Sequence, residues 1–180
     1  MFERKGFVAA TVEDIVAVAG VSHGTFYRYF GSKDQVYRVV ELAVQNEILA
    51  VLAPVENLLD DGPVTRIERA NRRFLEAYRD KAAMAAVIEQ VATINADTAE
   101  ERLALRRRFV SRAQAGVERL QEQGAADPSL DPYHAASALS SMVERFAYIW
   151  FVLGEDFEFE RSVQTLSRLW AQALGITLVP

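Results

Sequence analysis

The sequence has no cysteine and only two histidines in 180 residues. The missing cysteine excludes disulfides, thiolate catalysis and cysteine-based metal sites, and His23 and His134 alone cannot form a conventional zinc site. Glycine and proline are also scarce, with nine and five residues, which favours a helical fold over a loop-rich or all-β one. We expect neither a metal nor a cofactor.

Long apolar segments and catalytic motifs are missing too. The longest uninterrupted apolar run, residues 146–153, is far shorter than the roughly 20 residues that cross a bilayer, and no signal peptide is visible at the start. We therefore expect a cytoplasmic protein with no membrane partner. Because there is no serine-histidine-acid spacing, glycine-rich phosphate loop or histidine-rich cluster, an enzyme is the least favoured class.

The most informative segment present is residues 11–40, TVEDIVAVAGVSHGTFYRYFGSKDQVYRVV. Thr11, Ser22 and Ser32 each carry a side-chain oxygen that can cap the start of a helix. Gly20 can take the left-handed conformation that ends one helix and redirects the chain into the next. This spacing predicts a helix-turn-helix unit, which indicates DNA binding.

The expected second helix of this unit covers residues 23–30. Phe26 and Phe30 lie four residues apart and therefore share an inward face. The outward face carries the hydrogen-bond donors His23, Thr25, Tyr27, Arg28 and Tyr29, and Gly24 allows close backbone approach. Lys33 lies in the first turn of the third helix, where a positive charge is unfavourable because it opposes the helix dipole. A nearby DNA phosphate would explain a lysine at this position.

The charge distribution gives only weak support to DNA binding. The net charge is −5, and residues 1–40 carry five basic and four acidic side chains, leaving −6 for the remainder. Specific contacts and dimerisation must therefore supply much of the affinity. The weak charge leaves an alternative open, a dimeric helical protein that binds a small molecule or a partner and whose head is vestigial.

Residues 6–40, GFVAATVEDIVAVAGVSHGTFYRYFGSKDQVYRVV, closely resemble the DNA-binding head of TetR-type (TetR/AcrR) bacterial transcriptional regulators, and the match extends over about residues 2–42. The recurring family pattern from Gly20 to Lys33 is present without a gap. His23 departs from it, since many members carry lysine there. Residues 1–6 resemble only the end of the family's first helix, so we expect this helix to be truncated.

The resemblance implies how the head contacts double-stranded DNA. It implies that His23, Gly24 and Thr25 approach base edges, and that Tyr27 and Lys33 hold phosphates. It also implies that Thr11 caps its helix and contacts the DNA that flanks the bases read by the head. The complete predicted set of DNA-contact residues is Thr11, Ser22, His23, Gly24, Thr25, Tyr27, Arg28, Tyr29 and Lys33.

Beyond the head, the apolar spacing stays helical. We expect an all-α protein, with a three-helix helix-turn-helix head at residues 1–42 and an antiparallel helical bundle for effector binding and dimerisation at residues 43–180. The third head helix is expected to end before Pro54, and Thr98 with Glu101 to open a long helix that stops at Gly124.

The helix expected at residues 133–153 is apolar nearly all round, so it must cover its own bundle and a second chain. With the last helix, residues 159–174, it is expected to form a four-helix homodimer interface. The predicted interface residues are Ala138, Ile149, Trp150, Leu166, Trp170 and Ala173.

Apolar residues of the bundle are candidates for an effector cavity, although such stripes also form plain cores. The predicted lining residues are Phe74, Tyr78, Ile88, Phe109, Met142 and Phe146. The arginine runs at residues 72–73 and 106–108 are interpreted as solvated helix faces. Together these features predict a homodimeric, ligand-responsive repressor that binds a pseudo-palindromic operator and a small, largely apolar effector.

Overall fold

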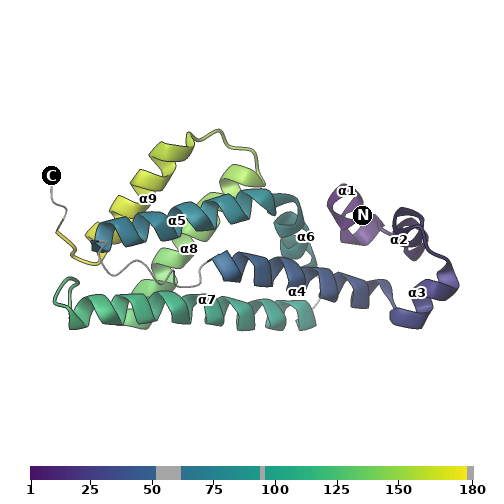
Figure 1. The fold of residues 1–180 in the computed structure, drawn as a ribbon, viewed down its shortest axis with the longest axis horizontal. Helices are drawn as coiled ribbons and strands as arrows, with labels where there is room; N and C mark the ends of the chain where they lie inside the picture. Colours follow the sequence, from purple (N-terminus) through teal and green to yellow (C-terminus); the bar gives the residue numbers. More distant parts are fainter. Residues whose placement is uncertain (52–61, 94–95, 178–180) are drawn as a thin grey trace.

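The computed structural model describes residues 1–51, 62–93 and 96–177. Over these ranges the chain is helical and contains no strand, which confirms the predicted all-α class. The helices are α1 (Phe2–Ala9), α2 (Val12–Ala19), α3 (His23–Tyr29), α4 (Lys33–Val51), α5 (Pro63–Asp80), α6 (Ala82–Ala92), α7 (Ala96–Glu122), α8 (Pro132–Phe151) and α9 (Phe159–Ala173). The molecule is elongated, and α1, α2 and α3 lie together at one end (Figure 1).

The helix starts predicted in the head are confirmed by their hydrogen bonds. Thr11 Oγ1 accepts from Asp14 N at 3.2 Å, and Asp14 Oδ2 accepts from Thr11 N at 3.1 Å, which completes a capping box. Gly20 ends α2 in the left-handed region, at φ 67° and ψ 30°. Ser32 Oγ accepts from Gln35 N, but the Gln35 side chain binds Gly31 N rather than Ser32 N.

The head is attached to the body through α1 and α6. Helix α1 is broken at Gly6, which has φ 71° and ψ 171°. Phe2 and Phe7 pack against Tyr37 of α4 and against an apolar group on α6 that includes Met84. This shared core fixes the position of α1 relative to α6, so the head does not stand free of the body.

Helix α4 runs without interruption across residue 42, so the two predicted domains share one helix. The predicted helix end before Pro54 lies outside the described residues, as do the side chains of Thr98 and Glu101. The predicted stop at Gly124 is confirmed in position, because this residue has φ 67° just after α7.

The body is built from two helix pairs, in which α5 packs along α9 and α7 packs along α8. Phe74, Leu75, Val143 and Val163 belong to the core that joins α5, α8 and α9. A second core at the far end joins α7, α8 and α9. Over the described ranges, none of the helices combines the length and hydropathy needed to cross a membrane.

Helix α8 has a fully buried face, confirming that it covers its own bundle. Ala136, Val143 and Ala147 on this face are at most 4% exposed. Ala138, on another face, is exposed. This leaves an outward surface on α8 beside the buried one.

The structure corrects one of the six predicted dimer residues. Leu166 is only 2% exposed and lies in the core of its own chain. Trp170 packs against both cores of the body but is only half-buried, as are Ile149 and Trp150, so it stays a predicted interface residue. Leu166 was assigned to the wrong surface because the period of the α9 stripe reveals an apolar face but not the element that covers it.

Candidate nucleic-acid interface and ligand cavities

Helix α3 lies at the head end of the molecule (Figure 1) and exposes a polar face. The exposed residues are His23, Gly24, Thr25, Tyr27, Arg28 and Tyr29. Tyr27 and Tyr29 are 58% and 73% exposed, whereas Phe26 on the opposite face is 4% exposed and packs 5.8 Å from the ring centre of Phe30. Both tyrosine side chains therefore leave most of their surface open to a partner.

The start of α3 is held by a local hydrogen-bond pair. Ser22 Oγ accepts from Thr25 N at 3.1 Å, and the two hydroxyl oxygens lie 3.0 Å apart. Both side chains stay exposed, so they can exchange hydrogen bonds with a bound phosphate or base. The cap orients the first turn of α3, which carries His23 and Gly24.

Lys33 has partners that sequence reasoning missed. Its Nζ donates to the carbonyl oxygens of Phe7 and Ala10, each at 2.8 Å, and lies 4.4 Å from the centre of the Phe7 ring. A third carbonyl, that of Val8, is 3.5 Å away. The ammonium therefore caps the end of α1, and this contact explains a cation at this position without the DNA phosphate that the sequence suggested.

A second cation of the head is also engaged internally. Lys5 Nζ lies 2.6 Å from Asp14 Oδ1, and this hydrogen bond, with those from Thr11, lowers the pKa of the Asp14 carboxyl group. The positive charge that the head offers to DNA is therefore smaller than its residue count indicates. Arg28, exposed on α3, contributes directly to that face.

The body contains a cavity of about 520 Å³, called here the inner cavity, between α4, α5, α6, α7 and α8. Its apolar wall includes four predicted lining residues: Phe74, Tyr78, Ile88 and Phe109. The other two, Met142 and Phe146, pack against the core instead and do not line it. They were misplaced because they share the α8 apolar pattern without facing the cavity.

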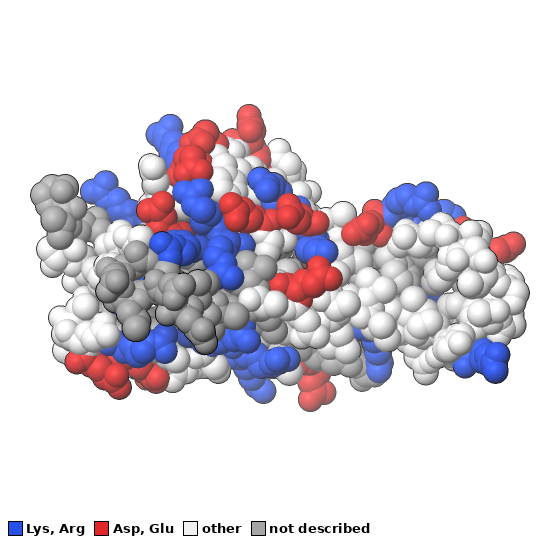
Figure 2. All heavy atoms as spheres, viewed as in Figure 1, with Lys and Arg blue, Asp and Glu red and all other residues white. Residues whose placement is uncertain are grey.

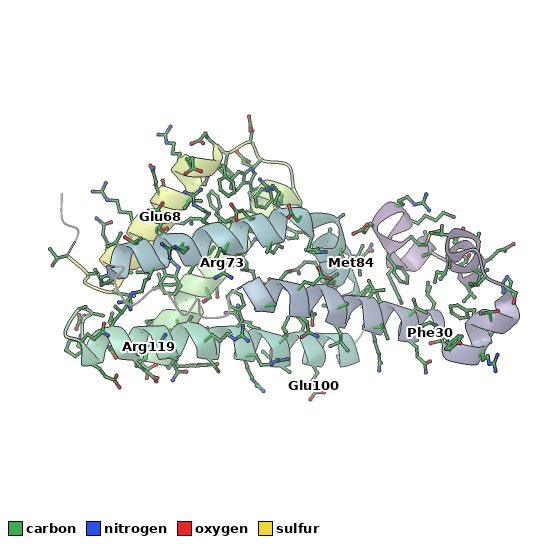
Figure 3. All side chains as sticks on the ribbon, viewed as in Figure 1. Phe30, Glu68, Arg73, Met84, Glu100 and Arg119 are labelled. Carbon is green, nitrogen blue, oxygen red and sulfur yellow. The ribbon has the colours of Figure 1, made fainter. Side chains whose placement is uncertain are left out.

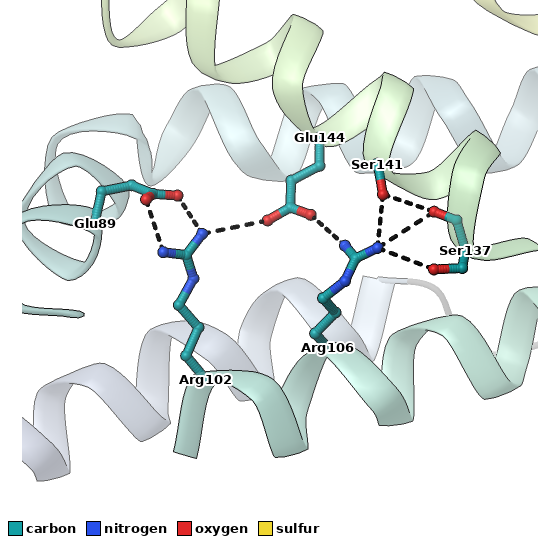
Figure 4. Close-up of polar contacts among 6 residues, drawn as sticks. All are labelled: Glu89, Arg102, Arg106, Ser137, Ser141 and Glu144. Atoms are coloured by element: carbon teal, nitrogen blue, oxygen red, sulfur yellow. Dashed lines mark hydrogen bonds and ion pairs between the residues drawn. The ribbon is translucent and has the colours of Figure 1, made fainter. Parts of the chain in front are cut away.

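A chain of charged groups crosses the polar wall of the inner cavity (Figure 4). Both terminal guanidinium nitrogens of Arg102 bind Glu89, and Nη2 lies 3.8 Å from Glu144. Arg106 donates to Glu144 at 3.0 Å and to Ser141 Oγ at 2.6 Å. This corrects the interpretation of Arg106 as a solvated residue, and it leaves the charges of this wall mutually paired.

Burial raises the pKa of the Tyr78 phenol well above its usual value, and the nearby Glu144 charge adds to this effect. Tyr78 is therefore a neutral group in the wall at physiological pH. The sequence signal for the polar wall was the pair Arg102 and Arg106, which lie one turn apart on α7. Their partners on α6 and α8 lack any local signal.

A smaller cavity of about 260 Å³, called here the outer cavity, lies between α5, α7, α8 and α9. Phe74 and Phe109 line both cavities, and their rings meet edge to face with centres 5.4 Å apart. The two aromatic rings therefore form a partition between the cavities. In the part of the chain that the structure describes, no group of histidine and acidic residues has the arrangement of a metal site.

Comparison with known proteins agrees with this arrangement. The model of the family "Bacterial regulatory proteins, tetR family" matches residues 1–40, and that of "Transcriptional regulator EthR, C-terminal domain" matches residues 67–175. The HTH-type transcriptional regulator EthR of Mycobacterium tuberculosis is 23% identical over 176 residues, covering 97% of this chain and 82% of the relative. EthR of Mycolicibacterium smegmatis is 25% identical over 182 residues, covering 99% and 82%.

Solved structures share the fold. A tetR-family bacterial regulatory protein from Rhodococcus RHA1 has a TM-score of 0.78 at 19% identity, covering 98% of this chain and 92% of that one. PfmR from Thermus thermophilus has a TM-score of 0.72 at 22% identity, covering 95% and 92%. AibR, solved with isovaleryl coenzyme A and operator DNA, has a TM-score of 0.68 at 16% identity, covering 93% and 90%. The head, the helical body and the two family matches together show that the chain belongs to the tetR family of bacterial regulatory proteins, with an EthR-type C-terminal domain, and is a DNA-binding transcriptional regulator.

Proposed function

We propose that this regulator is a homodimeric, ligand-responsive repressor of a pseudo-palindromic operator. The observation that carries the proposal is α3, whose donor-bearing face is exposed at the head end of the molecule while its aromatic face is anchored. Such a helix enters the major groove, and two heads contact half-sites one helical turn or a multiple apart. AibR, a structural relative, was solved with both operator DNA and a small ligand.

The proposed DNA contacts fall into two kinds. His23, Gly24 and Thr25, at the start of α3, approach base edges. Tyr27, Arg28 and Tyr29 follow on the exposed face and contact phosphates or neighbouring bases, while Thr11 and Ser22 add contacts at the starts of α2 and α3. Base contacts determine the operator sequence, whereas phosphate contacts determine register and the salt dependence of binding.

The proposed dimer interface uses the outward surfaces of α8 and α9. Ala138 and Ala173 are exposed there, and Leu169 is 45% exposed. Ile149 and Trp150 of α8 are half-buried, and Trp150 stacks on Phe151 with ring centres 4.3 Å apart. Small and apolar side chains on two neighbouring helices suit close packing against a two-fold mate.

The proposed effector site is the inner cavity, because α6 connects it to the head. Ile88 lines the cavity and also belongs to the core that holds Phe2 and Phe7 of α1. A ligand that shifts α6 therefore changes the placement of α1 and the separation of the heads. By thermodynamic linkage, effector and operator then weaken each other's binding by the same factor.

The test is operator selection followed by binding measurements. Genomic fragments retained by the protein at moderate salt are sequenced, and the affinity of the recovered site is measured by fluorescence anisotropy. We expect His23→Ala to change the preference at particular bases, and Arg28→Gln to weaken binding to all sequences. Glu122→Gln, at the far end of α7, is the matched control. If no fragment binds above non-specific DNA, the alternative with a vestigial head is correct.

A further inference from the structure

The outer cavity has an unusual combination of an apolar interior and arginines. Val117, Leu120 and Leu174 form its buried wall. Arg66 of α5 and Arg112 and Arg119 of α7 also line it. No carboxylate belongs to the described part of this lining. The lining of the inner cavity differs, because it includes the carboxylates of Glu89 and Glu144.

The arginines mark the side on which the outer cavity meets solvent. Arg119 is exposed and Arg66 is half-buried. Figure 3 shows Arg119 near the end of α7, at the same end of the body as the first turn of α5. A Cβ atom built on Gly116 would lie 4.0 Å from Arg119 Nη2, so this guanidinium lies against the helix at a residue that lines the cavity.

Charged side chains of both signs lie on the surface of the body. In Figure 2, blue Lys and Arg side chains gather over α5 and α7, with red Asp and Glu side chains among them. Arg72 of α5 is neutralised by Glu160 of α9, with Nη1 and Oε1 2.5 Å apart. Arg66 and Arg119 have no such ion pair with any residue in the described ranges.

Size indicates that the outer cavity does not act alone. At about 260 Å³ it is slightly smaller than typical ligand pockets, which measure roughly 300 to 1,000 Å³. The inner cavity lies directly behind Phe74 and Phe109. Phe74 and Phe109 are the lining residues that the two cavities share, and Ile88 of α6 lines the inner cavity beyond them.

From this geometry we infer that the effector is an amphipathic anion whose charged head binds Arg66 and Arg119 and whose unbranched apolar tail passes Phe74 and Phe109 into the inner cavity. The inference rests on the proposed ligand-responsive function and names the ligand class. A carboxylate or phosphate gains charge-assisted hydrogen bonds from a guanidinium, and the tail gains burial in proportion to its length. The paired charges around Arg102 offer no free cation, so the anionic head belongs at the outer end.

The binding test compares ligands that have unbranched tails of nearly equal length and differ in the charge of the head group. Decanoate, decanol and decyltrimethylammonium are titrated into the full chain. The readouts are calorimetry and tryptophan emission, to which Trp170 of the outer cavity and Trp150 both contribute. We expect decanoate to bind roughly tenfold more tightly than decanol, a difference of about 1.4 kcal/mol, because its charge strengthens the hydrogen bonds from the guanidinium groups. The cationic ligand should bind most weakly. Equal affinity for all three ligands overturns the inference.

Variants then locate the head group and the tail. The double variant Arg66→Gln with Arg119→Gln should weaken decanoate binding about tenfold and leave decanol within about twofold. Arg108→Gln, an exposed arginine of α7 that lines neither cavity, is the matched control. Ala92→Phe, which fills part of the inner cavity, should weaken both ligands. Unchanged decanoate binding in the double variant or in Ala92→Phe overturns the corresponding half of the inference.

Two further arms identify the source of the anion and separate this inference from the proposed function. Decanoate, decyl phosphate and decanoyl coenzyme A each combine an anionic head with an unbranched tail. The ligand that binds most tightly identifies the chemical source of the anion. If none of the three binds, the inference is overturned. Operator affinity is measured separately without ligand. Loss of ligand preference with intact operator binding refutes only the ligand class, whereas absent operator binding refutes the proposed function.

Discussion

Replacing Lys33 with methionine tests whether this lysine positions α1 or contacts DNA. The ammonium donates to Phe7 O and Ala10 O at 2.8 Å each and lies over the Phe7 ring. Helix α1 has no basic residue in its own last turn, so Lys33 supplies the cation that its carbonyl end favours. Methionine keeps the apolar stem over the ring and removes only the charge and the donors.

The expected loss of stability follows from these contacts. A hydrogen bond to a charged group contributes about 1.5 to 3 kcal/mol, and the half-buried position of Lys33 allows water to replace part of it. We therefore expect a loss of about 2 kcal/mol in the free energy of unfolding. For a chain of this size, that loss corresponds to a fall in Tm of roughly 4–8 °C.

Thermal unfolding and the salt dependence of operator binding distinguish the two roles. A positioning role predicts the lower Tm, with the slope of log affinity against log salt unchanged. Arg28→Gln is the comparison variant, and it should keep the Tm while reducing the magnitude of that slope by about one per head. If Lys33→Met keeps the Tm and reduces the slope, the lysine is a phosphate contact and our assignment fails.

Three further predictions follow from other contacts. The pKa of Asp14 is lowered by its bond to Lys5, so its stabilising contribution is complete above the ordinary carboxyl pKa and is lost as the pH falls through the lower folded value. Asp14→Asn should therefore make the free energy of unfolding depend less on pH in the acid range, whereas Glu13→Gln should leave this dependence unchanged. Unfolding is followed by circular dichroism. Leu166→Ala should lower the free energy of unfolding, measured by chemical denaturation, by about 2–5 kcal/mol because it leaves a void in the core. If the variant loses the dimer without this loss of stability, Leu166 is an interface residue and not a core residue. Ala173→Arg should shift gel filtration towards the monomer at unchanged Tm, whereas an unchanged dimer would refute the proposed interface.

Sequence reasoning succeeded in the head because the decisive contacts there are local. The Thr11 and Ser22 caps bind amides three residues away, and Gly20 requires only its own backbone conformation. Residue identity and spacing are sufficient to predict such features. The apolar periods of the body likewise predicted its helices, including α8 with its buried face.

Contacts between distant segments were not predictable in the same way. Lys33 reaches carbonyl oxygens 23 to 26 residues earlier, and Arg106 reaches Glu144 38 residues later. No local pattern identifies these partners, because they depend on how the helices pack. The same limit explains Leu166, since an apolar stripe does not reveal whether its own chain or a second chain covers it.

The internal use of the cations changes the expected balance of forces in operator binding. The count of charges already gave residues 1–40 a net charge of only +1. Lys5 is now paired with Asp14, and Lys33 lies on the end of α1. Few cations are therefore left to release counterions from DNA, and the acidic body repels the phosphates. Non-specific binding is expected to be weak for this reason, so retention on DNA must depend on base contacts from α3 and on the simultaneous docking of two heads. A change in head separation then removes most of the affinity, because little sequence-independent attraction remains to hold a mismatched dimer on the operator.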